Sequence, residues 1–245
     1  MNEYGLIGKT LKHSFSKAYF TEKFEKEGVE GSFLNFELPT IEDFVPLLKQ
    51  HPNLRGLSVT IPYKTEIIPF LDKLDSTAQQ IGSVNSIRIR DGHTTGYNTD
   101  ASGFSASIKP FLAHGMERAL ILGTGGASKA VAFALRQIGL DVMFASRSPK
   151  AGQLAYSDIN QHAVKAFKLI VNTTPLGMFP DIDSAPNIPY EHLGSEHLLY
   201  DLTYNPAETE FLRRGKSQGA LTVNGLSMLQ IQAELSWEIW NSGGA

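Results

Sequence analysis

The first hundred residues alternate between short strand-like runs and runs with helical spacing. Apolar or alternating runs, typical of strands, occupy residues 4–8, 32–38, 54–61, 83–90 and 93–97. Helices are predicted for residues 17–27 and 41–50, and a further helix for residues 227–240. Gly28 ends the first of these helices, and the Asp91-Gly92 pair is typical of a tight hairpin turn. This alternation predicts an α/β fold with mainly parallel sheets.

Residues 119–135 carry the most specific local pattern. Their sequence, ALILGTGGASKAVAFAL, predicts an apolar strand, a glycine turn and a helix. Gly123, Gly125 and Gly126 fall where the chain must turn sharply and let a pyrophosphate approach backbone amides at a helix N-terminus. Glycine turns also occur for steric reasons alone, but the apolar run before this one and Ser128 after it favour dinucleotide binding.

The next predicted strand, residues 141–145, ends without an acidic residue. In the dinucleotide fold an acid about 20 residues on binds the ribose of NAD, whereas an Arg accommodates the 2′-phosphate of NADP. Here the strand is followed by Ser146, Arg147 and Ser148, with Lys150 close behind, and Asp141 stands at its start. An ordinary solvated Arg at the end of a strand is the alternative explanation of Arg147. Together with the glycine turn, however, the pattern favours NADP over NAD as the cofactor.

Composition excludes several classes of function. The 245 residues are 42% hydrophobic and 19% charged, as in a globular protein, and a net charge of −3 argues against a nucleic-acid partner. The absence of Cys excludes disulfides, thiolate catalysis and zinc-thiolate sites. Glu191-His192 and Glu196-His197 lack the spacing of a zinc motif and are expected on the solvated surface, so no metal is predicted. With neither a secretion signal nor a membrane-spanning run, we expect a cytoplasmic protein with no membrane partner.

Three polar clusters precede the glycine turn, and each has an ordinary alternative. Ser14 and Ser16 can donate to one carboxylate ligand, or can cap the helix that follows. Thr60 and Lys64 follow a buried strand at its carboxyl end, where α/β proteins usually bind ligands, although a lone Lys is usually solvated. Asp100 lies just before the cofactor domain, and either faces a cleft between domains or caps a turn.

The order of the motifs decides between these alternatives. The motifs are HSFS (13–16), VTIPYK (59–64), GSVNS (82–86), GYNTDASG (96–103), GTGGAS (123–128), VNTTPLGM (171–178), YDLTYNP (200–206) and NGLSMLQIQA (224–233). This series closely resembles the shikimate dehydrogenase family, and it spans nearly the whole chain.

The resemblance implies an N-terminal α/β substrate domain plus a Rossmann-type dinucleotide-binding domain, with the C-terminal helix returning to the first domain. The substrate-binding catalytic domain is expected to comprise residues 1–101 and 225–245, and the NADP-binding domain residues 102–224. The implied activity is the reversible NADPH-dependent reduction of 3-dehydroshikimate to shikimate, in the chorismate pathway to the aromatic amino acids. A quinate/shikimate dehydrogenase of broader specificity and a non-catalytic shikimate-sensing homologue are the alternatives. The protein is expected to be a monomer or a homodimer.

The resemblance also assigns roles to individual residues. The catalytic residues are Lys64 and Asp100. The substrate-binding residues are Ser14, Ser16, Thr60, Asn85, Tyr204 and Gln232. The cofactor-binding residues are Gly123, Gly125, Gly126, Ala127, Ser146, Arg147, Ser148, Asn172, Thr173, Met178 and Gly225.

Lys64 and Asp100 suit the chemistry of carbonyl reduction. Hydride addition turns a carbonyl oxygen into an alkoxide, and the Lys64 ammonium can donate a hydrogen bond to that oxygen. By the resemblance, Asp100 orients Lys64 and a ring hydroxyl of the substrate. Whether Lys64 transfers the proton itself or only polarises the oxygen stays open at this point.

Gln232 is polar on an otherwise apolar helical stripe. It shares that stripe with Met228, Leu235 and Ile239, so its amide needs a hydrogen-bond partner. An internal partner is the ordinary explanation, and the resemblance favours the substrate.

Two features depart from the family pattern. Ser58 stands where the motif commonly has Asn, so a hydrogen bond to substrate or backbone is expected to be shorter or water-mediated. Residues 147–172 form a shorter stretch than usual, so we expect one strand–helix element of the cofactor domain to be missing or reduced. Trp237 and Trp240, three apart on the last helix, are expected to pack rather than to bind a base.

Overall fold

The computed structural model describes residues 1–11, 14–113 and 115–243, and the chain folds into two compact units. The first unit comprises Met1–Thr99 and Gln232–Ala245, and the second comprises Asp100–Ile231. The divisions fall beside the expected boundary at residue 101 and, at the other end, inside the last helix. No helix in the described part of the chain has the length and apolar character that crossing a membrane requires.

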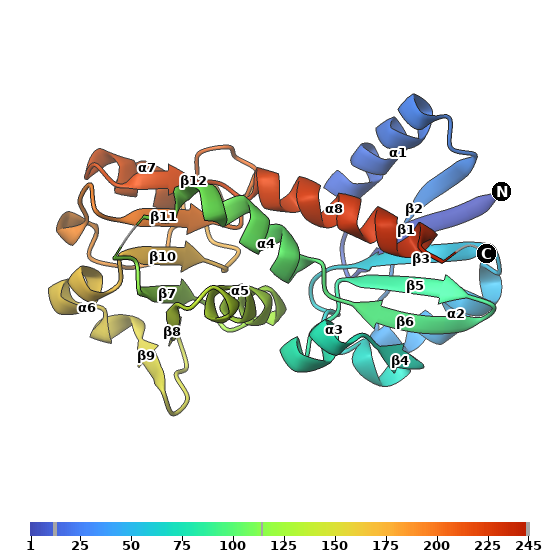
Figure 1. The fold of residues 1–245 in the computed structure, drawn as a ribbon, viewed down its shortest axis with the longest axis horizontal. Coiled ribbons are helices and arrows are strands. Elements are labelled where there is room, and N and C mark those ends of the chain that lie inside the picture. Colours follow the sequence, from blue (N-terminus) through green and yellow to red (C-terminus); the bar gives the residue numbers. More distant parts are fainter. Residues whose placement is uncertain (12–13, 114, 244–245) are drawn as a thin grey trace. The chain divides into compact units, whose positions relative to one another are not determined.

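The first unit is built on a mixed sheet with strand order β2-β1-β3-β5-β6-β4 (Figure 1). Its strands are β1 (Asn2–Gly8), β2 (Gly31–Glu37), β3 (Leu54–Val59), β4 (Lys73–Leu74), β5 (Ser86–Arg90) and β6 (His93–Tyr97). Its helices are α1 (Phe15–Glu27), α2 (Phe44–Gln50), α3 (Ser76–Ile81) and the C-terminal part of α8 (Leu226–Asn241). The predicted strands are confirmed, and β5 and β6 form the antiparallel hairpin that Asp91-Gly92 predicts. β5 also runs antiparallel to β3, which makes this sheet mixed.

Local sequence explains where these helices begin and end. The Ser14 hydroxyl accepts a hydrogen bond from the Lys17 amide at the start of α1, and Gly28, with a φ of 65°, ends the helix. Asp75 caps α3 in the same way by accepting from the amides of Thr77 and Ala78. The alternative role of Ser14 as a helix cap is therefore present in the structure.

Aromatic packing fastens α1 and α8 to one face of the first sheet. Phe20 of α1 and Trp240 of α8 are buried, and their ring centroids lie 5.2 Å apart. Trp240 also covers Gly56 in β3, where an added Cβ would lie 2.2 Å from the indole ring. The prediction that Trp240 packs in the core is confirmed, and α8 can lie this close only because residue 56 has no side chain.

A polar network joins α8 to α1 outside this aromatic core. The Lys23 ammonium lies 2.8 Å from Glu234 Oε2 and 2.7 Å from Glu27 Oε1, and the Tyr19 hydroxyl donates to Glu234. Burial alone would raise the pKa of Glu234, but the hydrogen bonds from Lys23 and Tyr19 outweigh it and lower the pKa. Burial would likewise lower the pKa of Lys23, but its bonds to Glu234 and Glu27 raise it.

Glu234→Gln should therefore destabilise the protein at neutral pH. Glu234 is partly exposed and its ion pair is screened by solvent, so we expect a loss of about 0.5–1 kcal/mol in the free energy of unfolding. A lowered carboxylate pKa contributes stability above the unfolded pKa and loses it as the pH falls through the folded pKa, so the loss should vanish on acidification. Urea denaturation between pH 7 and the acid limit, at about half-unit steps, measures both effects.

Glu238→Gln on the same helix is the matched control, because Glu238 is exposed and has no ion-pair partner among the described residues. Equal losses in the two variants, or a loss at Glu234 that is independent of pH, would contradict the assignment.

The second unit is built on a parallel sheet with strand order β12-β11-β10-β7-β8-β9 (Figure 1). Its strands are β7 (Arg118–Leu122), β8 (Asp141–Ser146), β9 (Gln153–Ala155), β10 (Leu169–Asn172), β11 (Leu198–Asp201) and β12 (Leu221–Val223). Its helices are α4 (Asp100–Ile108), α5 (Gly126–Gln137), α6 (Gln161–Ala166), α7 (Glu210–Ser217) and the N-terminal part of α8. Numbered from β7 and followed from the β9 edge, the order is the 3-2-1-4-5-6 arrangement of dinucleotide-binding folds.

The connection from β8 to β9 is unusually short for neighbouring parallel strands. Residues 147–152, all of which are described, contain no helix, whereas such a crossover usually takes a dozen residues or more. The short connection suffices because β9 begins beside Phe144, near the end of β8, and pairs only with the last residues of that strand. Within the stretch 147–172, which was expected to be reduced, the connection from β8 to β9 contains no helix, and β9 and α6 are both present.

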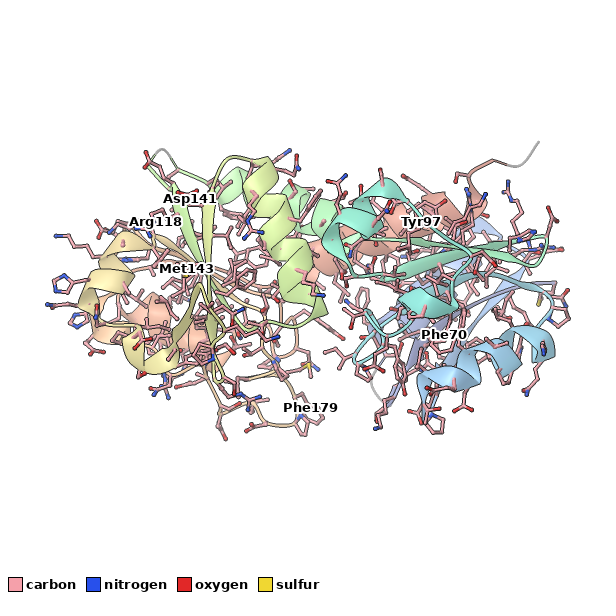
Figure 2. The ribbon with its side chains drawn as sticks, turned by 90° about the horizontal axis from the view of Figure 1, so that it is seen from below. Phe70, Tyr97, Arg118, Asp141, Met143 and Phe179 are labelled. Atoms are coloured by element: carbon pink, nitrogen blue, oxygen red, sulfur yellow. The ribbon has the colours of Figure 1, made fainter. Side chains whose placement is uncertain are left out.

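The amino end of β8 borders a surface hollow that the short β9 does not reach. The hollow has a volume of about 400 Å³ and is lined by Arg118, Arg136, Leu140, Asp141, Val142, Met143 and Phe167. Figure 2 labels Arg118, Asp141 and Met143 at this end of the sheet, and Arg118 lies 4.6 Å from the centroid of the Phe167 ring. The carboxyl ends of the same strands, which the predicted cofactor residues follow, lie at the opposite end of the strands from this hollow.

Candidate functional site

Asn85 and Gln232 are brought together in the first unit, in a buried cluster that also holds Thr99 and Ser236. Asn85 Nδ2 donates to Thr99 Oγ1 at 2.8 Å and to Gln232 Oε1 at 3.2 Å, and Asn85 Oδ1 accepts from the Thr99 amide at 2.7 Å. Thr99 Oγ1 lies 3.1 Å from Ser236 Oγ, one turn beyond Gln232 on α8. The cluster therefore fixes both amide side chains before any ligand arrives.

This cluster answers the question that Gln232 raises in the sequence. Its carbonyl oxygen has an internal partner in Asn85, as the ordinary explanation requires. Thr99 and Ser236 were not predicted as cluster members. The sequence nevertheless contains the information needed to predict them, because Thr99 belongs to the GYNTDASG motif and Ser236 follows Gln232 by one helical turn.

The other predicted residues of the first unit follow β1 and β3 along the chain. Thr60 directly follows β3, and its amide donates to the Ile7 carbonyl at 3.0 Å, while the Lys64 carbonyl accepts from Val84 at 2.7 Å. Lys64 is partly exposed. Ser16 is buried in the first turn of α1. His13, the first residue of the HSFS motif, lies outside the described residues.

Asp100 begins α4 in the second unit and is almost completely buried, with 4% of its surface exposed. A carboxylate in the first turn of a helix interacts favourably with the positive end of the helix dipole. The preceding residue, Thr99, is fixed through both its amide and its hydroxyl by Asn85. The point at which Asp100 enters its helix is therefore set by hydrogen bonds, and not only by packing.

The glycine turn after β7 has a conformation suited to a pyrophosphate. Gly123 has a φ of 106°, and a Cβ there would meet Thr173 Oγ1 at 2.8 Å, so the fold itself requires that glycine. Gly125, the N-cap of α5, has an ordinary φ of −79°, and a Cβ there would meet nothing within 4 Å. Packing therefore does not require a glycine at residue 125, and the open space beside the N-terminus of α5 would admit a bound phosphate.

The remaining residues of this turn complete the start of α5. Gly126 and Ala127 form its first turn, so their amide groups belong to the unpaired N-terminal set of the helix. The buried Ser128 hydroxyl donates to the Gly125 carbonyl at 2.6 Å, which leaves the turn's amides for an anion. These groups fit the pyrophosphate of a dinucleotide cofactor.

Ser146, Arg147 and Ser148 follow at the carboxyl end of β8. The Ser146 hydroxyl accepts from the Ser148 amide at 3.2 Å, and Arg147 and Ser148 are exposed. No carboxylate ends β8, since the strand closes with Ala145 and Ser146. The donor set suits a phosphate better than a ribose diol.

Asn172, at the end of β10, is fully buried, and its side chain shapes the neighbouring loop. Its Oδ1 accepts from the Thr174 amide at 3.0 Å and from the Thr174 hydroxyl at 2.6 Å. Its Nδ2 donates to Asp201 Oδ1 at 3.1 Å. Thr173 is held as well, because its hydroxyl donates to the Leu122 carbonyl at 2.7 Å. The contacts of Asn172 support a role in holding the loop that leads to Met178.

Asp201, at the end of β11, is the centre of this network and was not predicted. The carboxylate is fully buried and accepts three hydrogen bonds. The donors are the Asn172 side-chain amide, the Thr203 backbone amide at 2.9 Å and the Thr209 hydroxyl at 2.6 Å. Burial raises the pKa of Asp201, and the bonds from Thr209, Thr203 and Asn172 act in the opposite direction. Its position in the YDLTYNP motif is the sequence feature that could have identified it.

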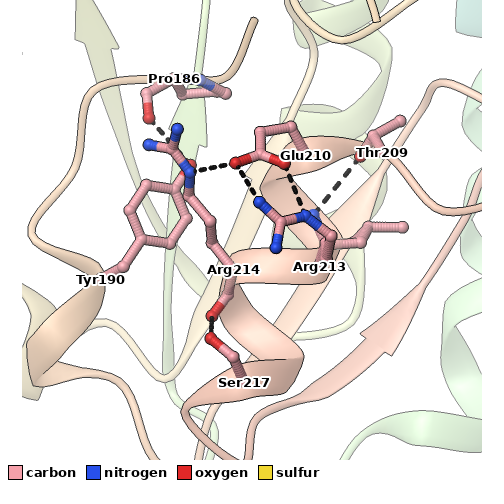
Figure 3. A network of polar contacts seen from close by, with 8 residues as sticks. Pro186, Tyr190, Thr209, Glu210, Arg213, Arg214 and Ser217 are labelled. Atoms are coloured by element: carbon pink, nitrogen blue, oxygen red, sulfur yellow. Dashed lines mark hydrogen bonds and ion pairs between the residues drawn. The ribbon is translucent and has the colours of Figure 1, made fainter. Parts of the chain in front are cut away.

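Thr209 connects this network to α7. Its hydroxyl donates to Asp201 and accepts from the Leu212 amide at 3.4 Å, and its carbonyl accepts from the Arg213 amide at 2.8 Å. Figure 3 shows Thr209 beside the ion pairs that Glu210 forms with Arg213 and Arg214. The start of α7 is thus fixed by the same carboxylate that holds Asn172.

Met178, Tyr204 and Gly225 lie apart from the glycine turn in sequence. Met178 is exposed, and burial raises the pKa of Tyr204. A Cβ on Gly225 would lie 2.1 Å from the carbonyl oxygen of Leu202. Packing against that backbone accounts for Gly225 without a ligand.

The expectation of a solvated surface around residues 191–197 is wrong for His197. Its side chain is 1% exposed, because its Nδ1 faces Gly194 and its Nε2 lies 3.1 Å from the Val164 carbonyl. Glu196 is instead exposed and pairs with Lys168. The buried imidazole serves as a hydrogen-bonding link between two chain segments.

Thr209→Val should destabilise the second unit. Val has nearly the same shape but removes both the donor to Asp201 and the cap of α7, so we expect a loss of about 1–3 kcal/mol in the free energy of unfolding. Thr209→Ser keeps the hydroxyl and is the matched control, with a smaller loss. Chemical denaturation of the three proteins measures the difference, and equal losses would show that the hydroxyl does not matter.

Comparison with known proteins was consistent across sequence and structure. Residues 6–87 match the model of the shikimate dehydrogenase substrate binding domain. The chain is 40% identical over 258 residues to a shikimate dehydrogenase (NADP(+)) of Carboxydothermus hydrogenoformans, covering 96% of this chain and 90% of the relative.

Solved structures agree with this match. A shikimate 5-dehydrogenase of Thermus thermophilus in complex with NADP(H) and shikimate is 33% identical, with a TM-score of 0.87 over 99% of this chain and 94% of that one. A quinate dehydrogenase of Corynebacterium glutamicum in complex with NAD is 27% identical, with the same TM-score and the same coverage of both chains.

Sheet order, glycine turn and polar clusters together define an α/β protein with a Rossmann-type dinucleotide-binding unit, an architecture typical of nicotinamide-dependent oxidoreductases. The match to the substrate-domain model and the identity over nearly the whole chain narrow that class. The chain belongs to the shikimate dehydrogenase family.

Proposed function

We propose that the protein is an NADP-dependent shikimate dehydrogenase that reversibly reduces 3-dehydroshikimate to shikimate with NADPH. The observation that carries the proposal is the open space at Gly125, at the N-terminus of α5, followed by a β8 end that has Arg147 in place of an acid. A pyrophosphate fits the first feature and a 2′-phosphate the second. Family membership supplies the substrate class.

The bound nicotinamide supplies the hydride, and the chain's residues stabilise the charge that develops on the substrate. Lys64, as an ammonium, donates a hydrogen bond to the carbonyl oxygen as it becomes an alkoxide. Asp100 accepts a hydrogen bond from a ring hydroxyl, and Thr60, Asn85, Tyr204 and Gln232 orient the ring. Ser14 and Ser16 hold the substrate carboxylate by hydroxyl donation.

The buried cluster in the first unit supports these roles for Asn85 and Gln232. Because their amide groups are already fixed by Thr99 and by each other, little side-chain entropy remains to be lost when the substrate binds. The same bonds fix the backbone just before Asp100. Pre-organised groups of this kind favour the transition state.

A quinate/shikimate dehydrogenase of broader specificity is the second candidate. The observation that favours it is Ser58, whose side chain is smaller than the Asn common in the family motif. The structural likeness to a quinate dehydrogenase is compatible with both candidates. Quinate carries one hydroxyl more than shikimate, and a smaller side chain leaves more room for it. The test is the substrate assay described next.

Lys64→Ala and Asp100→Asn should each fold normally and lose turnover. Reduction of NADP⁺ by shikimate, followed at the absorbance band of the reduced nicotinamide, should fall by on the order of 10²–10³ in kcat, as for the loss of one oxyanion-type contact. Lys49→Ala, an exposed residue of α2, is the control and should keep full activity.

An assay of the wild-type protein with each combination of shikimate or quinate and NADP⁺ or NAD⁺ separates the candidate functions.

The outcomes of these assays are distinct. Turnover of shikimate with NADP⁺ alone supports the proposal, and comparable turnover of quinate favours the broader enzyme. Binding of shikimate without reduction of either cofactor would leave a sensing role instead. Full activity of Lys64→Ala would remove Lys64 from the mechanism.

Arg147→Ala should raise the KM for NADP⁺ by about 10- to 100-fold, the range for hydrogen bonds to a charged group, and leave the KM for NAD⁺ nearly unchanged. The reason is that only NADP⁺ carries the 2′-phosphate. Arg136→Ala, on the exposed last turn of α5, is the matched control. A parallel rise for both cofactors would show that Arg147 does not recognise the phosphate.

A further inference from the structure

The loop that carries Arg147 and Lys150 lacks the helix that usually leads away from it. Residues 147–152 run directly from the end of β8 into β9, which re-enters the sheet beside Phe144. In a longer crossover, the first turn of a helix would fix the backbone at these positions. Here another interaction has to hold the loop, because a loop that must become ordered when it binds a phosphate loses conformational entropy and therefore binds more weakly.

Gln153 supplies such an interaction at two points. Its backbone amide donates to the Lys150 carbonyl at 3.0 Å, and its side-chain Oε1 accepts from the Lys150 amide at 3.0 Å. Both backbone groups of Lys150 are thus bonded to one residue. Gln153 is itself fixed, because it is paired with Phe144 as the first residue of β9.

The start of the loop is held by another hydrogen bond. The Ser148 amide donates to the Ser146 hydroxyl at 3.2 Å, so the residues on either side of Arg147 are joined. The segment that carries both cations is thus held at its start by Ser146 and at its end by Gln153.

We infer that Gln153 is the positioning residue of the cofactor's 2′-phosphate loop, holding with two hydrogen bonds a connection that contains no helix. This inference rests on the proposed function, because it takes the 2′-phosphate of NADP to bind at Arg147 and Lys150. Gln153 does not contact the cofactor. It holds the backbone of Lys150, and through it the turn that presents both cations to the phosphate.

Gln153→Met tests the inference, because Met has nearly the length of Gln but no acceptor. Adenosine 2′,5′-bisphosphate and 5′-AMP are the probes, with binding measured by titration calorimetry. We expect affinity for the bisphosphate to fall about fivefold, the size of one net hydrogen bond, and affinity for 5′-AMP to stay the same. In the enzymatic assay, KM for NADP⁺ should rise by the same factor, with kcat and KM for shikimate unchanged. Gln137→Met, at the exposed end of α5, is the control.

A double-mutant cycle distinguishes positioning from a general structural role. In an Arg147→Ala background, Gln153→Met should have a smaller effect on bisphosphate binding, because part of what Gln153 positions is then gone. An unchanged affinity for the bisphosphate, an equal loss for both probes, or full additivity in the cycle would overturn the inference. Gln153→Ser removes the same acceptor and serves if the Met variant does not fold.

Failure of the proposed function gives a different result. A wild-type protein that binds the two probes equally well would show that no 2′-phosphate site exists, whatever Gln153 does. A wild-type preference for the bisphosphate that survives in Gln153→Met would overturn only the inference about Gln153.

Discussion

Polar groups buried at the ends of strands must find hydrogen-bond partners inside the chain, and both units are organised around this requirement. In the first unit Asn85 satisfies it by bonding to Thr99 and Gln232. In the second unit Asp201 satisfies it by accepting from Asn172, Thr203 and Thr209. Each unsatisfied group of this kind would cost about 1–3 kcal/mol, so these networks restrict the loops around them to one arrangement.

These networks place rigid support directly behind the residues proposed to bind ligands. Thr173 and Thr174 are held through Leu122 and Asn172, and Thr173 in turn is the side chain that a Cβ on Gly123 would strike. The glycine turn and the loop after β10 are therefore packed as one assembly. A change at Asp201 or Thr209 should therefore alter the packing of the glycine turn, although neither side chain belongs to that turn.

The sequence predicted strands, helices and the glycine turn well because those features depend on local patterns. Apolar runs, Gly28 and the ALILGTGGAS segment each act within a few residues of themselves. The antiparallel pairing of β5 with β3 and the burial of His197 depend instead on partners about 30 residues away along the chain. The role of Thr209 depends on a fold that buries Asp201 beside it. His197 shows the difference: its neighbours Glu196 and Ser195 are polar and suggest a surface, but a carbonyl at residue 164 provides a buried partner.

Glycines illustrate why a motif residue needs its structural context before a role is given to it. Gly56 is required by the indole of Trp240, and Gly225 by the backbone of Leu202, so the fold alone explains both. Gly123 is required by its positive φ and by Thr173. Gly125 alone among these four has an ordinary φ and open space where its side chain would be. A residue that the fold would allow to be larger, at the N-terminus of a helix with unpaired amides, points to an anionic ligand more directly than the glycine count of the motif does.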